Sequence, residues 1–271
     1  MIYTEQDFVE LSKQDLQHSR ALRRKQHPEA SIYLQSKLDP IGEDLERLGS
    51  DYGGWVFSPS MLIENSEGTI NVLAGAGEDL SFDLELKRRY GAEIAIIDPT
   101  PRALTHYKNL REAFANGQKF AINASEETYE FKNVSFEKID FLPYALWKEC
   151  KEMRFYQPAV SSSVSHSLTN IQKTEHFIIV ESKTLSEVLT EIGCDQINIL
   201  KLDIEGAEIE VCSSLSELNF LPKQLLIEFD ELQMPDENTY GRIHSAMRTL
   251  RELGYRLEHI EGRQNCLFIL T

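Results

Sequence analysis

Three carboxylates and a glycine lie close together in the segment Asp203-Ile204-Glu205-Gly206-Ala207-Glu208. Asp203 is the last residue of the largely apolar run 197–203, which is typical of a strand covered on both faces. An open α/β sheet binds ligands beyond the carboxyl ends of its strands, so Asp203 is predicted to belong to a binding site. Glu205 and Glu208 have an alternative interpretation as first-turn acids of a following helix. Carboxylates also bind divalent cations. The sequence shows no second group of potential ligands at a spacing typical of a metal site, so no metal site is predicted, although metal binding stays open.

A second candidate site is the small-residue loop Ala74-Gly75-Ala76-Gly77-Glu78-Asp79, called the glycine loop below, which begins at the last residue of the apolar run 69–74. Small residues let the backbone approach a ligand closely, as in loops that cradle nucleotides. Asp98 ends the next apolar run, 21 residues after Gly77 (98 − 77). A carboxylate at that distance reaches ribose hydroxyls in a nucleotide-binding βαβ unit. The alternative for Asp98 is a turn or N-cap carboxylate ahead of Thr100-Pro101.

The loop favours S-adenosylmethionine over a pyrophosphate cofactor. A full GxGxxG fingerprint would place its last glycine at position 80, which is Leu80, and Glu78-Asp79 would repel phosphate. S-adenosylmethionine has no phosphate and carries a sulfonium and an ammonium group, which suit an acidic loop. An NAD-type oxidoreductase is the alternative enzyme, and a non-catalytic cofactor-binding or interaction module is the alternative from another class.

Three side chains are candidates for proton removal from an acceptor. Methyl transfer from a sulfonium is an in-line displacement, so catalysis is mainly positioning of the acceptor with optional help from a base. His166, in the polar loop 155–167 with its serine run, is the first candidate, and Glu228, at the end of the run 224–229, is the second. Glu205 is the third. A loop histidine and a strand-end salt bridge are the structural alternatives for His166 and Glu228.

The elements that position these residues follow from periodicity and capping signals. Apolar runs predict strands, and stretches of helical period between them predict right-handed βαβ units in an open twisted sheet. Thr100-Pro101 predicts the start of one helix, and Thr184 with Glu187 forms a capping box at another. The predicted strands are 69–74, 93–97, 136–144, 197–203 and 224–229, followed by a helix over 238–253 and a β-hairpin over 255–260 and 265–270. Helices are also expected over 5–26 and 38–48, with a turn over 51–55.

Composition excludes several classes of partner. The chain has 271 residues, with 44 Asp and Glu against 28 Lys and Arg, which gives a formal net charge of −16. Nucleic-acid binding needs clustered basic charge, so neither a nucleic acid nor an anionic membrane surface is an expected partner. The N-terminus lacks the pattern of a secretory signal, and no apolar run reaches the ~18 residues of a spanning helix, so a cytoplasmic location is expected. The four cysteines are expected to be reduced thiols, and an oligomer is possible but not indicated.

Several motifs together resemble the FkbM-type S-adenosylmethionine-dependent methyltransferases. The most specific is Lys201-Leu202-Asp203-Ile204-Glu205-Gly206-Ala207-Glu208, and the others are the glycine loop with Ser81-Phe82-Asp83, Asp98-Pro99-Thr100-Pro101, the strands 225–230 and 265–269, and Leu253-Gly254-Tyr255. The resemblance implies a class I methyltransferase fold of the α/β class. This is a Rossmann-like, seven-stranded mixed sheet, mostly parallel with an antiparallel C-terminal hairpin and helices on both faces. An N-terminal helical extension (1–60) would precede the methyltransferase domain (61–271).

The resemblance also implies site roles. The methyl group of S-adenosyl-L-methionine would pass to a hydroxyl of a sugar, glycan or secondary metabolite. The loop Ala74, Gly75, Ala76, Gly77 and Glu78 would hold the methionine portion, and Asp203 would face the same end. Asp98 would bind the ribose, Pro99 and Thr100 would border the adenosine, and Ala145 and Leu146 would lie beside the adenine.

Overall fold

The computed structural model describes residues 33–62, 69–122, 127–157, 166–170, 174–233, 235–262 and 264–271. The helix expected over 5–26 and the serine run 161–163 lie outside these residues. No helix within the described ranges has the length and apolar character to cross a bilayer.

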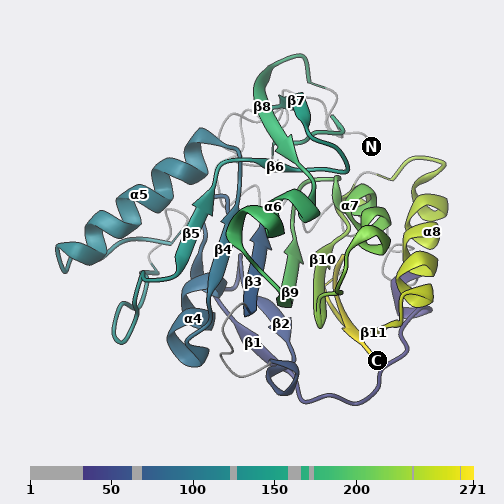
Figure 1. Ribbon diagram of the computed structural model, residues 1–271, viewed down its shortest axis with the longest axis horizontal. Coiled ribbons are helices and arrows are strands. Elements are labelled where there is room, and N and C mark those ends of the chain that lie inside the picture. The colour runs from purple at the N-terminus through teal and green to yellow at the C-terminus, as the bar shows by residue number, and fades with distance from the viewer. Residues whose placement is uncertain are drawn as a thin grey trace.

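A seven-stranded mixed sheet forms the centre of the molecule (Figure 1), as the sequence predicts. Its strand order is β11-β12-β10-β9-β3-β4-β5. All neighbours from β10 to β5 pair in parallel, whereas β12 is antiparallel to both of its neighbours. The strands are β3 (Thr69–Ala74), β4 (Ile94–Ile97), β5 (Ile139–Leu142), β9 (Gln196–Leu202), β10 (Gln224–Glu228), β11 (Tyr255–Glu261) and β12 (Asn265–Leu270). The chain leaves β3 first toward β4 and later toward β9, so the topological switch point lies between β3 and β9.

Helices cover both faces of this sheet because its central strands are apolar on both sides. In β3, Val72 and Ala74 pack into one core with α6, α7 and α8, whereas Leu73 packs into the other core with α4 and α5. The helices are α4 (Ser81–Tyr90), α5 (Pro101–Ala115), α6 (Leu185–Ile192), α7 (Glu208–Ser214) and α8 (Thr239–Glu252), with 3-10 turns at Pro59–Met61, Leu215–Glu217 and Asp230–Gln233. The predicted N-cap at Thr100 and the capping box at Thr184 are confirmed.

The helix predicted over 38–48 is wrong. Residues 38–45 belong to no helix or strand, and β1 (Glu46–Leu48) follows them and pairs with β2 (Trp55–Phe57) across the predicted turn. The buried carboxylate of Glu258 accepts hydrogen bonds from the consecutive backbone N–H groups of Ile41 (2.6 Å), Gly42 (3.0 Å) and Glu43 (3.0 Å). These donors would otherwise need helical or solvent partners, so a distant contact replaces the helix. Leu48, Trp55 and Phe57 join the same core as α4, so the hairpin is part of the main body.

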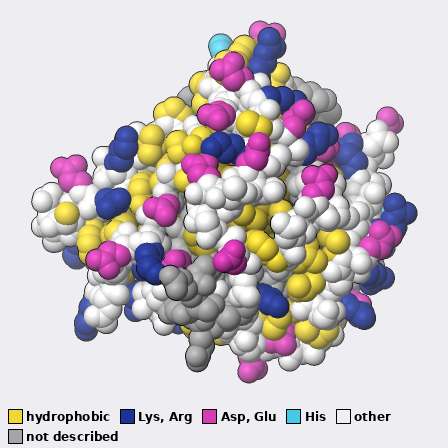
Figure 2. All heavy atoms as spheres, viewed as in Figure 1, with side chains coloured by type: hydrophobic (Ala, Val, Ile, Leu, Met, Phe, Trp, Pro, Cys, Tyr) yellow, Lys and Arg dark blue, Asp and Glu magenta, His cyan; other side chains and the backbone are white. Residues whose placement is uncertain are grey.

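A small three-stranded sheet lies above the central sheet in Figure 1. It contains β6 (Ala145–Leu146), β7 (Lys151–Tyr156) and β8 (Phe177–Lys183). The strand predicted over 136–144 is shorter in the structure, because the chain turns after β5 and enters β6. On the face in Figure 2, acidic and basic side chains are interspersed, so the acidic excess forms no single patch there.

Candidate functional site

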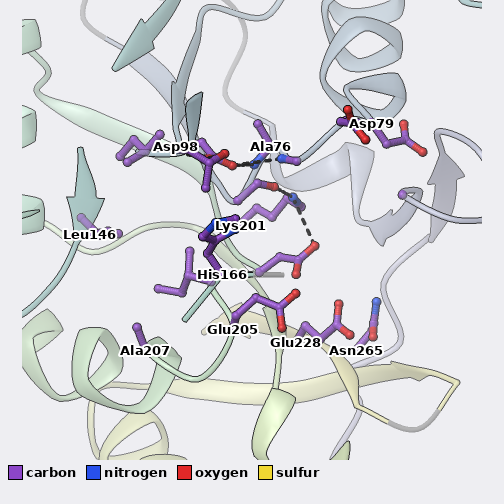
Figure 3. Close-up of a pocket in the computed structure, with 18 of the residues that line it drawn as sticks. Ala76, Asp79, Asp98, Leu146, His166, Lys201, Glu205, Ala207, Glu228 and Asn265 are labelled. Atoms are coloured by element: carbon purple, nitrogen blue, oxygen red, sulfur yellow. Dashed lines mark hydrogen bonds and ion pairs between the residues drawn. The ribbon is translucent and has the colours of Figure 1, made fainter. Parts of the chain in front are cut away.

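A cavity of about 380 Å³ lies at the carboxyl ends of β3, β4, β9 and β10, beside the topological switch point. This volume is within the range of small-molecule and cofactor sites. The small sheet contributes Ala145 and Leu146 from β6 and Phe155 from β7 to its wall. Figure 3 shows side chains from separate strands converging on this space.

The glycine loop is built by close approach of two strand ends. Gly75 has a φ of +86°, and a Cβ atom there would lie 1.7 Å from the carbonyl oxygen of Asp203. Only glycine fits a backbone with this φ and this neighbour. The small residue predicted for ligand approach is therefore also required by the protein's own chain.

Asp98 holds the glycine loop to the end of β4 (Figure 3). Its Oδ2 accepts hydrogen bonds from the backbone N–H groups of Ala76 and Gly77, both at 3.0 Å. Its Oδ1 accepts from Thr100 N (2.8 Å) and Thr100 Oγ1 (2.6 Å), beside Pro99 at the start of α5. The alternative interpretation of Asp98 as a turn carboxylate is thus realised, and ribose binding by the same group stays a prediction.

The two acids at the end of the glycine loop line the cavity and also have partners within the protein. Glu78 pairs with Arg102 at 2.6 Å. Asp79 accepts from Ser50 Oγ (2.6 Å) and from the backbone N–H of Ser81 (2.9 Å). These hydrogen bonds connect the turn between β1 and β2 to the glycine loop.

Lys201 is a site residue that the sequence interpretation missed. It is buried in β9, where its Nζ donates to the carbonyl oxygen of Gly75 at 2.7 Å and lies 3.6 Å from Asp203 Oδ2. The signal was a lysine within an apolar strand, since a buried ammonium needs partners. Lys201 therefore ties the glycine loop to the strand-end carboxylate.

Asp203, Glu205 and Asp230 form a carboxylate cluster at the adjoining ends of β9 and β10. Each offers an oxygen, and these oxygens all lie within 4.8 Å of one another. Burial, together with repulsion from neighbouring carboxylates, Glu205 foremost, raises the pKa of Asp230 well above its usual value. Asp230 follows the strand end Glu228-Phe229, which was the signal for it.

The first-turn interpretation is wrong for Glu205, because α7 begins at Glu208. Glu205 precedes the helix with a φ of +55°, and its carbonyl oxygen accepts a hydrogen bond from Ser167 Oγ at 2.6 Å. Glu208 does lie in the first turn. Its Oε1 accepts from the backbone N–H groups of Ile204 and Gly206, both at 3.0 Å, so it fixes the loop that carries Glu205.

The three candidate bases all line the cavity (Figure 3). The ring of His166 stacks on Phe155 with 5.6 Å between centroids. Glu228 ends β10 and accepts a hydrogen bond from Gln264 Nε2. The structure therefore brings His166, Glu205 and Glu228 to one space, although they come from three separate segments.

The wall of the cavity is strongly acidic. Among the described residues that line it, eight are Asp or Glu and two, Arg47 and Lys201, are Arg or Lys. Arg47 is paired with Glu261 at 2.6 Å, and Lys201 is held as described above. The acids are Asp51, Glu78, Asp79, Asp98, Asp203, Glu205, Glu228 and Glu261. Such a surface favours a cationic ligand and disfavours phosphate.

Comparison with known protein families identifies a methyltransferase FkbM domain over residues 69–257. The chain belongs to this family. The comparison with curated proteins and the comparison with solved structures each gave no match. The FkbM match begins at β3 and ends within β11, so it contains the glycine loop, Asp98 and the carboxylate cluster. It leaves outside the β1–β2 hairpin and β12, although both pack against the same core as the FkbM strands.

Proposed function

We propose that the protein transfers the methyl group of S-adenosyl-L-methionine to a hydroxyl oxygen of a sugar, a glycan or a secondary metabolite. The observation that carries this proposal is an acidic cavity at the β3–β9 switch point of an FkbM-family chain. We further propose that residues 61–271 form the methyltransferase domain and that residues 1–60 are an extension of it, whose β1–β2 hairpin packs into the core of that domain and contributes to the cavity wall.

The residues of the cavity fit this cofactor. S-adenosylmethionine carries a sulfonium and an ammonium group, and eight carboxylates against two paired cations leave the wall negative. Gly75, Ala76 and Gly77 line the cavity, so their backbone is available to the methionine portion. Ala74, the last residue of β3, was expected to join them, but it is buried in the core and does not line the cavity. A pyrophosphate would instead meet Glu78 and Asp79.

We assign the remaining cofactor roles to residues at the same cavity. Asp98 and Thr100 adjoin the loop on the β4 side, where the ribose and the adenosine would lie. Ala145 and Leu146 are buried cavity residues that can pack against an adenine ring. Asp203 lies beside Gly75 at the methionine end.

When bound, the cofactor supplies an electrophilic methyl group. The protein's task is to hold the acceptor oxygen in line and to exclude water. His166 is our first choice for removing the hydroxyl proton, and Glu228 and Glu205 are the others, because all three face the cavity.

Calorimetry with S-adenosylhomocysteine and with NAD tests the proposal directly. We expect saturable binding of the first ligand and none of the second, and failure to bind S-adenosylhomocysteine would overturn the proposal. We expect Asp98→Ala to weaken S-adenosylhomocysteine binding at least tenfold. Removing the ribose hydroxyls from the ligand should weaken binding to the wild type and have little further effect on this variant. If the two losses add in full, Asp98 acts only through the loop.

The base assignment has its own test. His166→Ala should retain S-adenosylhomocysteine affinity and lose turnover at least a hundredfold once an acceptor is available, as expected for a general base. Full turnover by this variant would reject His166 and leave Glu228 and Glu205 to be replaced in turn.

A further inference from the structure

The carboxylate cluster of Asp203, Glu205 and Asp230 has a geometry that a single cation satisfies. Oxygen ligands lie about 2.0–2.6 Å from Mg²⁺ or Ca²⁺, so two of them on opposite sides of one ion are about 4–5 Å apart. The three oxygens here lie within 4.8 Å of one another. All three separations are therefore small enough for the oxygens to share the coordination sphere of one ion.

The register of the sheet explains why these residues meet. β9 and β10 are parallel neighbours in which Leu202 pairs with Ile227. Asp203 is the next residue on one strand, and Asp230 follows Ile227 by three residues on the other. Glu208 holds the backbone between Asp203 and the start of α7, which fixes the position of Glu205.

Asp230 supplies a second, independent observation. It is 2% exposed, and its Oδ2 has no hydrogen-bond partner, whereas its Oδ1 accepts from Gln233 Nε2 at 2.7 Å. A buried carboxylate oxygen without a partner costs free energy, so native structures almost always supply one. The neighbours of Asp230 within the cluster are acidic, so a cation is the partner that would satisfy it.

The charges nearby favour a divalent ion over a further ammonium group. Lys201 is the ion-pair partner of Asp203, with 3.6 Å between Nζ and Oδ2, and its Nζ also donates to Gly75. One ammonium group, that of Lys201, therefore already faces the three carboxylates of the cluster. Glu228 adds a fourth carboxylate to the cavity wall. A divalent ion compensates two of these charges at one point.

We propose that Asp203, Glu205 and Asp230 bind one divalent, oxygen-preferring cation such as Mg²⁺ or Mn²⁺. Asp203 and Glu205 also line the cavity, so the bound ion would be open to it. Three single-oxygen ligands leave coordination positions free on a six-coordinate ion. Resting on the proposed function, we infer that the oxygens of the acceptor fill these positions, which favours acceptors with two neighbouring hydroxyls, as on a sugar ring.

The test is a titration of the full chain with Mn²⁺ in the absence of cofactor, followed by calorimetry and by the electron paramagnetic resonance of free Mn²⁺. We expect one saturable equivalent in the wild type. Asp230→Asn and Glu205→Gln should each weaken binding at least tenfold. Asp195→Asn is the matched control, since this exposed residue lies just before β9, at the end opposite Asp203, and should bind Mn²⁺ as the wild type does.

Absence of saturable binding in the wild type would overturn the proposal, as would wild-type affinity in both cluster variants. Thermal unfolding gives a second readout, because Mn²⁺ should raise the unfolding temperature of the wild type and of Asp195→Asn but not of the cluster variants. S-adenosylhomocysteine binding is measured separately on the same proteins. Mn²⁺ binding without S-adenosylhomocysteine binding would refute the proposed function and keep the cation site, and the reverse result would refute the cation site alone.

Discussion

Replacing Gly75 by alanine should push apart the ends of β3 and β9, which approach each other closely at the glycine loop. The added Cβ would lie 1.7 Å from the carbonyl oxygen of Asp203, against an ordinary contact of 3.4 Å or more. The two backbones must therefore part by about 1.7 Å (3.4 − 1.7), and neither can escape by a side-chain rotation. The loop that must move carries Ala76 and Gly77, whose N–H groups bind Asp98.

The magnitude follows from two contributions. A non-glycine residue in the left-handed region costs roughly 1–2 kcal/mol, of which about 0.4–1 kcal/mol is offset by the smaller entropy of the unfolded chain. Overpacking adds typically 1–3 kcal/mol, and the rigid partner here places the change at the upper end. We expect Gly75→Ala to lower the free energy of unfolding by about 4 kcal/mol and to weaken S-adenosylhomocysteine binding at least tenfold.

Gly117→Ala is the matched control. Gly117 also has a positive φ, +63°, but an added Cβ there meets nothing within 4 Å. Its cost should be about 1 kcal/mol, from backbone conformation alone. Urea unfolding gives both free energies, and calorimetry gives the affinities. Equal stability of the two variants, with unchanged affinity in Gly75→Ala, would refute the reasoning.

Three further predictions concern single side chains. Burial raises the pKa of Glu208 from 4.5 to about 8, so the folded protein holds a proton there that the unfolded chain releases, and stability should fall as pH rises through this interval. Glu208→Gln should flatten that fall in unfolding experiments at pH 5 to 9, and an unchanged slope would contradict it. Thr184→Ala removes the capping box of α6 and should cost about 1 kcal/mol in urea unfolding, more than Thr190→Ala within the same helix. Lys201→Met leaves the Gly75 carbonyl oxygen without its donor and should cost about 1–3 kcal/mol and reduce S-adenosylhomocysteine affinity, whereas unchanged stability and affinity would remove Lys201 from the site.

Local signals in the sequence predicted most of the central sheet. The apolar runs of β3, β9 and β10 and the caps at Thr100 and Thr184 depend on neighbouring residues alone, and all appear in the structure. The segment 38–48 failed because its backbone donors bind Glu258, more than 200 residues away, a contact that periodicity cannot reveal.

The candidate site divides in the same way. Gly75 and Asp98 were found from residue type and spacing, but their contacts with Asp203 and with the loop N–H groups depend on how β3, β4 and β9 lie together. Asp230 was overlooked because its nearness to Asp203 comes from the pairing of β10 with β9. Residue types thus predicted the chemistry, and the register between strands decided which groups meet.

The position of β12 has a consequence for how the protein reaches its native state. Residues 265–270 are the last strand in the sequence, yet they lie between β10 and β11 and supply hydrogen bonds to both. The sheet therefore cannot be completed until the ribosome has synthesised residue 270. Until then β10, which carries Glu228 and leads to Asp230, has an unpaired edge, and such edges invite aggregation. A chain shortened to the FkbM match at 69–257 would keep that edge permanently exposed, so we expect it to be insoluble where the full chain is not.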